Sequence, residues 1–124
     1  MTVLATVVTA TEAATVVPAA VAEAGRRDSD LHVLDLTNGR DAATVTSTLD
    51  AARAELGTRS GSVVVLRPSI PDHAAAALVA ADEVGAEVMV IGVRHRSPVG
   101  KLVLGSVAQT ILLDADCPVL AVRV

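Results

Sequence analysis

Five short apolar runs alternate along this chain with four longer stretches that have a helical pattern. The apolar runs are rich in β-branched residues and nearly continuous rather than alternating, which is typical of strands covered on both faces. They are Val3–Val8, Leu31–Leu36, Val63–Leu66, Glu87–Val93 and Pro118–Val122. We therefore predict five buried strands.

The stretches between these runs are rich in Ala, Leu, Val and acidic residues, and they predict four helices. They are Glu12–Arg27, Asp41–Gly57, Pro71–Gly85 and Ser106–Ala115. Gly25, Gly57 and Gly85 stand where helix ends are expected. Pro71 followed by Asp72 suits the first turn of the third helix.

Strands separated by helices of this length indicate right-handed βαβ crossovers and a parallel sheet. We expect one α/β domain over residues 1–124, with a doubly wound five-stranded sheet and helices on both of its faces. In such a sheet, ligands bind beyond the carboxyl ends of the strands, where the strand order reverses. The ends of the first and fourth strands, near Thr9 and Arg94, are therefore the expected place for a site.

The charge of the chain is distributed unevenly. Ten basic and 14 acidic residues give a net charge of −4, yet Arg94, Arg96 and Lys101 lie within eight positions. The rest of the chain has seven basic and 14 acidic residues and therefore a net charge of −7. This charge argues against binding to nucleic acid or to an anionic membrane. Aromatic residues are absent, which also removes the platforms on which bases stack.

The chain carries features expected of a cytoplasmic protein. Its single cysteine, Cys117, excludes an intrachain disulfide, and we expect it to be a small buried hydrophobic residue. The N-terminus lacks the basic segment and cleavage site of a signal peptide. No apolar run approaches the roughly 20 residues that span a bilayer.

The fourth strand leads through the basic segment to the start of the last helix, an arrangement that can hold an anion. Backbone N–H groups and the positive end of a helix dipole would point to the same place. The candidate ligand-binding residues are Gly92, Arg94, Arg96, Lys101, Gly105, Ser106 and Val107. For Ser106, a role as the N-cap of the last helix explains the residue equally well.

Other chemical motifs are not supported. Gly100-Lys101 suggests a phosphate-binding P-loop, but that motif needs Gly in place of His95 and Ser or Thr in place of Leu102. Ser69, Asp72 and His73 have the residue types of a hydrolytic triad, yet they crowd into one helix start and favour a helix N-terminus instead. The histidines and Cys117 lack the spacing of metal ligands, so we predict no metal.

The last part of the chain resembles the universal stress protein family. The segment from Gly92 to Ser106 matches the spacing of the family signature: Gly92, two residues, His95, nine residues and then Gly105-Ser106. His95 stands where that signature has a glycine. The resemblance extends to the segments that flank this signature. These are Val88–Gly92, Cys117–Val122 and Ala80–Ala86.

The resemblance implies a parallel sheet in the order 3-2-1-4-5 and a homodimer. It also implies binding of an adenine nucleotide, usually ATP, in members that keep the full signature. Two positions depart from the pattern of those members: His95 replaces a glycine, and Val8–Glu12 contains no aspartate where one normally reaches the nucleoside.

Two functions follow as alternatives. The first is an ATP-binding regulatory domain of a stress response, and the second is a nucleotide-independent family member that acts as a dimeric interaction module. A hydrolase is the least supported class, since neither a general base nor a metal-binding carboxylate set stands near the basic segment. Because Pro118–Val124 predicts an apolar edge strand, we expect a two-fold dimer in which two such strands lie side by side.

Overall fold

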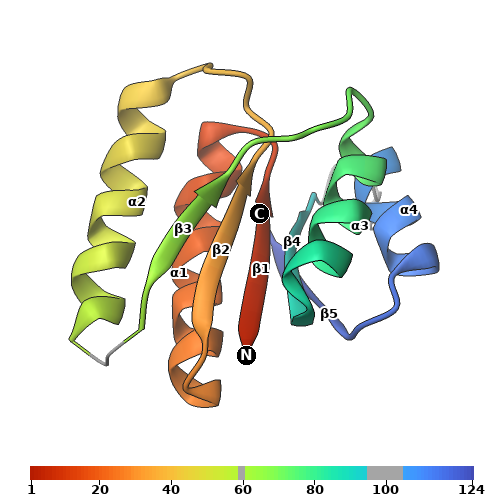
Figure 1. Ribbon diagram of the computed structural model, residues 1–124. Helices are drawn as coiled ribbons and strands as arrows, with labels where there is room; N and C mark the ends of the chain where they lie inside the picture. The colour runs from red at the N-terminus through yellow and green to blue at the C-terminus, as the bar shows by residue number, and fades with distance from the viewer. Residues whose placement is uncertain (59–60, 95–104) are drawn as a thin grey trace.

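A computed structural model of the chain describes residues 1–58, 61–94 and 105–124, and it shows an α/β fold with a five-stranded parallel sheet (Figure 1). The strands are β1 (Thr2–Val7), β2 (Asp30–Asp35), β3 (Val63–Leu66), β4 (Ala86–Val93) and β5 (Val119–Arg123). The helices are α1 (Ala10–Arg27), α2 (Ala42–Gly57), α3 (His73–Val84) and α4 (Ser106–Asp114). The sheet order is β3-β2-β1-β4-β5, so the predicted fold class and strand order are confirmed.

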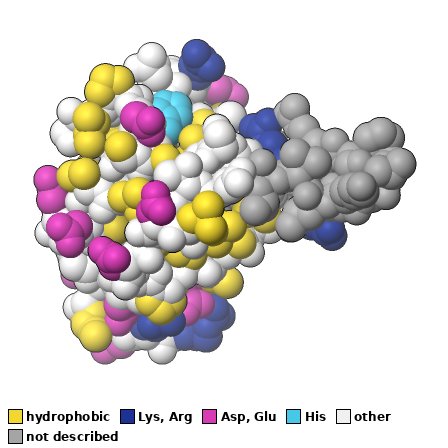
Figure 2. All heavy atoms as spheres, turned by 90° about the vertical axis from the view of Figure 1, so that its right-hand side faces the viewer, with side chains coloured by type: hydrophobic (Ala, Val, Ile, Leu, Met, Phe, Trp, Pro, Cys, Tyr) yellow, Lys and Arg dark blue, Asp and Glu magenta, His cyan; other side chains and the backbone are white. Residues whose placement is uncertain are grey.

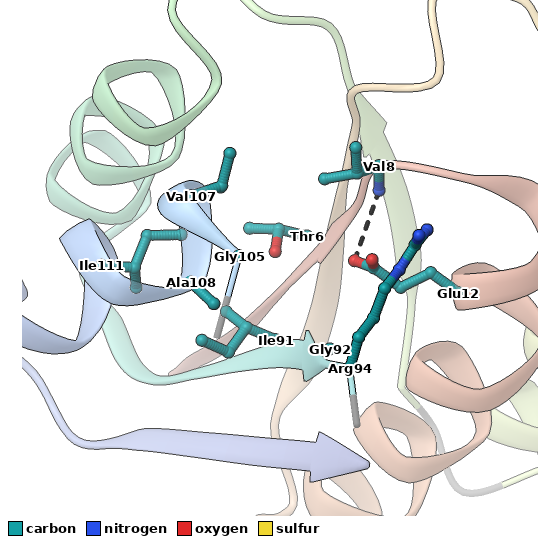
Figure 3. Close-up of a pocket in the computed structure, with 10 residues that line it drawn as sticks. All are labelled: Thr6, Val8, Glu12, Ile91, Gly92, Arg94, Gly105, Val107, Ala108 and Ile111. Carbon is teal, nitrogen blue, oxygen red and sulfur yellow. Dashed lines mark hydrogen bonds between the residues drawn. The ribbon is translucent and has the colours of Figure 1, made fainter. Parts of the chain in front are cut away.

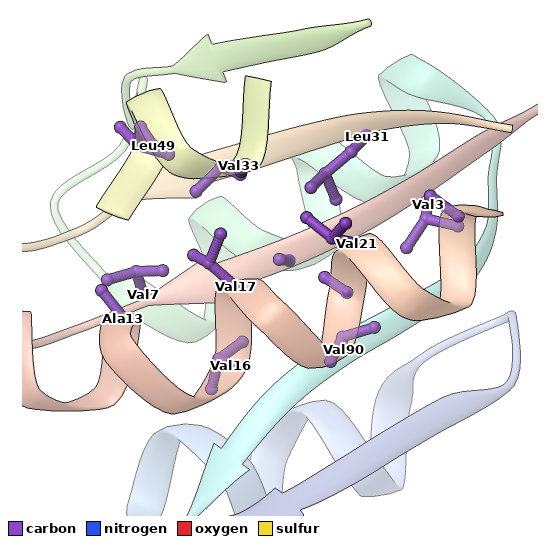
Figure 4. Packing of buried hydrophobic residues seen from close by; sticks show 14 of the residues in the cluster. Val3, Val7, Ala13, Val16, Val17, Val21, Leu31, Val33, Leu49 and Val90 are labelled. Carbon is purple, nitrogen blue, oxygen red and sulfur yellow. The ribbon is translucent and has the colours of Figure 1, made fainter. Parts of the chain in front are cut away.

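The helices cover the two faces of the sheet in pairs (Figure 1). Helices α1 and α2 pack on one face over a core that includes Val17, Val33 and Val90 (Figure 4). Helices α3 and α4 cover the other face, where Leu4, Met89 and other apolar side chains form a second buried cluster. Alanines at the helix surfaces allow the helices to approach the sheet closely, so aliphatic side chains build both cores without aromatic residues.

The helix boundaries differ from the predicted ones at positions where a side chain caps the backbone. Thr9 accepts a hydrogen bond from the Glu12 amide (3.1 Å), so α1 begins two residues earlier than expected. Asp72 accepts one from the Ala75 amide (3.0 Å) and is the N-cap of α3, which leaves Pro71 outside the helix. This capping role confirms that Asp72 belongs to a helix start.

The glycines expected at helix ends have different outcomes. Gly85 is the C-cap of α3 with φ 62°, a left-handed conformation that glycine adopts without steric cost. Gly57 is the last residue of α2. Gly25 does not end α1, which continues to Arg27, the end predicted for this helix, and has Asp28 as its C-cap in a left-handed conformation with φ 53°. Hydrogen bonding from the backbone of Asp28 to Ala24 and Gly25 compensates for that conformation.

Cys117 lies just before β5 and is half-buried rather than fully buried as expected. It packs against the cluster beneath α3 and α4, and burial raises the pKa of its thiol. Within the described ranges, no helix is both long and apolar enough to cross a membrane.

Candidate nucleotide site

A cavity of about 340 Å³ lies where the strand order reverses, between the carboxyl ends of β1 and β4 (Figure 3). Its walls come from β1, the start of α1, β4 and the start of α4. The lining residues are Thr6, Val8, Glu12, Ile91, Gly92, Arg94, Gly105, Val107, Ala108 and Ile111. The cavity therefore lies at the position where open parallel sheets bind their ligands, and its volume is in the range of ligand pockets.

The carboxyl group of Glu12 is the buried ionisable group of this cavity. Glu12 is only 6% exposed, and its Oε1 accepts a hydrogen bond from the Val8 amide (3.4 Å; Figure 3). Burial raises the pKa of Glu12, and the Val8 amide and the positive charge of Arg94 offset part of that increase. The carboxyl group can accept hydrogen bonds from hydroxyl or amino groups of a ligand.

Gly92 allows Glu12 to occupy this position. A Cβ atom at residue 92 would stand 2.7 Å from Cγ of Glu12 and 2.8 Å from a methyl carbon of Val124. Because real Cβ atoms do not approach other atoms so closely, any side chain at residue 92 would displace Glu12 or the end of the chain. Glycine at this position therefore allows β4 and the start of α1 to approach each other closely.

Arg94 and the start of α4 bring groups that favour anions to the same cavity. The Arg94 side chain extends beside that of Glu12 (Figure 3), and Gly105 is the N-cap of α4. Among the described residues, no side chain caps this helix by accepting a hydrogen bond from its first amides. Unpaired amides at a helix N-terminus attract negatively charged groups.

The predicted site residues are therefore brought together in part. Four of them line the cavity: Gly92, Arg94, Gly105 and Val107. Ser106 is the exposed first residue of α4 and does not line it, and its alternative role as N-cap was wrong because Gly105 holds that position. The predictions for Arg96 and Lys101, and the substitution at His95, lie outside the described residues.

Sequence reasoning missed Thr6 and Glu12 as cavity residues. Thr6 lies within a strand that reads as core, so its sequence carries no distinct signal. Glu12 did carry one, because Thr9-x-x-Glu12 matches a capping box, the pattern that marks a helix start. The carboxyl group accepts from the Val8 amide, one residue before the N-cap, and this turns it toward the end of β1.

A second cavity of about 570 Å³ adjoins the first and shares Val8 with it. It lies beyond the carboxyl ends of β1, β2 and β3. Its lining residues are Val8, Thr9, Leu36, Thr37, Asn38, Arg40, Pro68, Ser69, Ile70, Pro71 and His73. Ser69 and His73 thus belong to the wall of a cavity, although sequence analysis placed them only at a helix start.

Metal binding has no support in the described part of the chain. No group of three or more His, Cys, Asp or Glu side chains there is arranged to hold an ion. The cavities offer hydrogen-bonding groups and single charges instead.

A family model described as the universal stress protein family matches residues 1–123. The chain belongs to the universal stress protein family. A universal stress protein of Mycolicibacterium smegmatis is 42% identical over 107 residues, which cover 83% of this chain and 82% of that protein. The resemblance found in the sequence is thereby confirmed.

Solved structures share the fold over nearly the whole chain. A universal stress protein from Archaeoglobus fulgidus is 28% identical, with a TM-score of 0.75 and 98% of each chain covered. A structure of the Archaeoglobus fulgidus universal stress protein in complex with dAMP is 23% identical, with a TM-score of 0.69 and coverage of 98% and 97%. A universal stress protein in complex with cAMP is 24% identical, with a TM-score of 0.68 and coverage of 99% and 96%.

Proposed function

We propose that this universal stress protein binds an adenine nucleotide such as ATP and acts as a regulatory domain in a stress response. The observation that carries the proposal is the cavity between β1 and β4, which brings Arg94 and the N-terminus of α4 to one opening. Guanidinium groups and helix N-termini are common partners of phosphate oxygens.

Glu12 favours a nucleotide over free phosphate as the ligand. Its carboxyl group accepts hydrogen bonds and, when ionised, repels anions. A nucleotide has both kinds of group that this cavity needs, because its phosphates suit Arg94 and α4, whereas its ribose hydroxyls or amino group can donate to Glu12. Glu12 thus supplies an acid near the end of β1 in place of the aspartate that the sequence lacks.

Proteins of the same family support the choice of adenine nucleotides. The structures with dAMP and with cAMP have this fold over at least 96% of their own length. Both ligands combine an adenine base, a sugar and a phosphate, the combination that the charges around Glu12 and Arg94 suit.

Isothermal titration with ATP, AMP and inorganic phosphate tests the proposal. We expect heat with the nucleotides and weaker or no binding of inorganic phosphate, since only nucleotides offer a donor to Glu12. Arg94→Ala should weaken nucleotide binding about tenfold, because it removes a charge-assisted hydrogen bond.

Arg53→Ala provides the matched control. Arg53 lies on α2 at the surface, paired with Asp50 at 3.5 Å, and lines neither cavity. Absence of heat with every ligand at a few millimolar, where binding is worth only about −4 kcal/mol, would contradict nucleotide binding. That result would favour the nucleotide-independent interaction module.

We further propose that the protein forms a homodimer through β5. This strand is at the edge of the sheet and pairs with β4 on one side. Leu120 on β5 is 37% exposed. Figure 2, viewed from the side of α4 and β5, shows hydrophobic side chains at the surface among acidic ones. An apolar edge of this kind is usually covered by a partner.

A further inference from the structure

The second cavity is enclosed by two loops that come from different parts of the chain. One wall is formed by residues 36–40, between β2 and α2, and the other by residues 68–71, between β3 and α3. Val8 lines both cavities, so we expect a ligand that fills the first cavity and extends past Val8 to enter the space between these loops. The spacing of the two loops therefore bears on how well such a ligand fits.

The loop after β2 turns through residues in the left-handed region. Asn38 and Gly39 have φ values of 57° and 80°, and Asp41 at the start of α2 has φ 50°. Glycine adopts this region without steric cost, and Asn and Asp adopt it more readily than other residues do. The turn itself is therefore locally favourable, and its position relative to the neighbouring loop depends on hydrogen bonds at its base.

The buried carboxylate of Asp35 connects the two loops at their base. Asp35 is 5% exposed, and its Oδ1 accepts hydrogen bonds from the Thr37 amide (2.9 Å) and the Thr37 hydroxyl (2.6 Å). Its Oδ2 accepts one from the Arg67 guanidinium (2.5 Å), and Arg67 directly precedes the loop that begins at Pro68. One carboxylate is therefore hydrogen-bonded to both of the segments that form walls of this cavity.

The donors around Asp35 keep it ionised despite its burial. Burial by itself would raise the pKa of Asp35, but the two hydrogen bonds from Thr37 and the charge and hydrogen bond of Arg67 together hold that pKa below its usual value. A carboxylate in this setting accepts strong, charge-assisted hydrogen bonds and can act as a fixed anchor.

We infer that Asp35 is a positioning residue of the ligand site, which sets the spacing of the two loops that wall the second cavity. The inference rests on the proposed nucleotide binding. Asp35 lines neither cavity and acts through Thr37 and Arg67. Its loss should release both loops together and weaken binding of a nucleotide that reaches between them.

Asp35→Asn tests the inference with little change of shape, because the amide can still accept from Thr37 but no longer attracts Arg67 by charge. We expect AMP binding to weaken about tenfold in isothermal titration. In the free protein, the amide order parameters from 15N relaxation should fall at residues 37–40 and 69–70 together. Asp50→Asn is the matched control, since it breaks the exposed pair with Arg53 and should change neither measurement.

Two further variants separate positioning from general stability. Val17→Ala removes buried contacts between α1 and the sheet at a residue that lines neither cavity, so it should destabilise the fold without changing AMP affinity or the order parameters of the two loops. Arg67→Ala removes the ion pair between Arg67 and Asp35. Because the Arg67 side chain is 70% exposed, this variant is expected to fold even if Asp35→Asn does not. It should lower the amide order parameters mainly at residues 69–70 and also weaken AMP binding.

The outcomes distinguish this inference from the proposed function. If the wild-type protein binds AMP and Asp35→Asn or Arg67→Ala binds it with unchanged affinity, the positioning role is overturned and the proposed nucleotide binding stands. Lower order parameters in only one loop of Asp35→Asn overturn the connection between the walls. Wild-type protein that binds no nucleotide contradicts the proposed function, and the positioning role is then overturned with it.

Discussion

Glu12 places a carboxyl group inside a cavity that is otherwise lined mostly by aliphatic side chains. Its position depends on the missing side chain of Gly92, whose Cα faces the Glu12 side chain at close range. The two residues are 80 positions apart in the chain, and neither has this role unless the other is present. The local consequence is an acid whose charged form is disfavoured by burial.

Glu12→Gln should stabilise the protein at neutral pH relative to the wild type. Because the pKa of Glu12 is raised in the folded state, the unfolded chain loses its proton first as pH increases from about 4.5. The wild type therefore loses stability as pH rises from there through the folded pKa, and glutamine does not. Urea unfolding at pH 4 and pH 7.5 should show a larger difference between the two proteins at pH 7.5.

Glu55→Gln is a suitable control for this measurement, because Glu55 is exposed on α2. It should show little difference from the wild type at either pH. A constant offset between Glu12→Gln and the wild type at both pH values would mean that burial of the charge is not the cause.

Helix α1 depends on the Thr9 cap for the position of its first turn. Thr9 has extended backbone angles (φ −133°, ψ 160°) and accepts a hydrogen bond from the Glu12 amide. The same turn carries Glu12 into the first cavity, while Thr9 itself lines the second. The cap therefore links the stability of a helix to the geometry of the candidate site.

Thr9→Ala should lower the free energy of unfolding by about 1 kcal/mol, because it removes the acceptor at the N-terminus of α1. For a chain of this length the melting temperature should fall by about 4 °C. Thr11→Ala changes the same residue type at an exposed position in the first turn, and it should be neutral or slightly stabilising. Equal destabilisation by both substitutions would rule out the cap as the cause.

The assembly of the whole molecule is expected to depend on the exposed edge at β5. Leu120→Lys should weaken the proposed dimer at least tenfold, because it places a charge on an apolar strand that would be covered by the partner. Sedimentation at micromolar concentration would detect the shift toward monomer. Val79→Lys on α3 is a matched control, since Val79 is 37% exposed as Leu120 is. A wild-type protein that sediments as a monomer would contradict the dimer.

The arrangement of strands and helices was predictable because it depends on local patterns. Nearly continuous apolar runs identified each of the strands in residues 1–58, 61–94 and 105–124, and the helical stretches identified each of the helices there. Errors occurred at the starts of α1 and α3, where the capping hydrogen bonds of Thr9 and Asp72 rather than composition decide the boundary. The strand order came from the resemblance to the family rather than from these patterns.

The candidate site was predictable only where one segment carries it. Gly92, Arg94, Gly105 and Val107 follow from the path of a single β-to-α connection, and all four line one cavity. The contribution of Glu12 depends on how α1 begins and on what residue of β4 faces it. The connection from Asp35 to Arg67 spans 32 residues and depends on the register between β2 and β3.

Composition and periodicity thus account for the fold class of this protein, since backbone propensity and the apolar pattern of each strand and helix are properties of neighbouring residues in the chain. The identities of the groups that share a cavity are set by strand register and close approach between elements. Those contacts arise only when distant segments pack together. The roles of the buried acids Glu12 and Asp35 could therefore be recognised only in the tertiary structure.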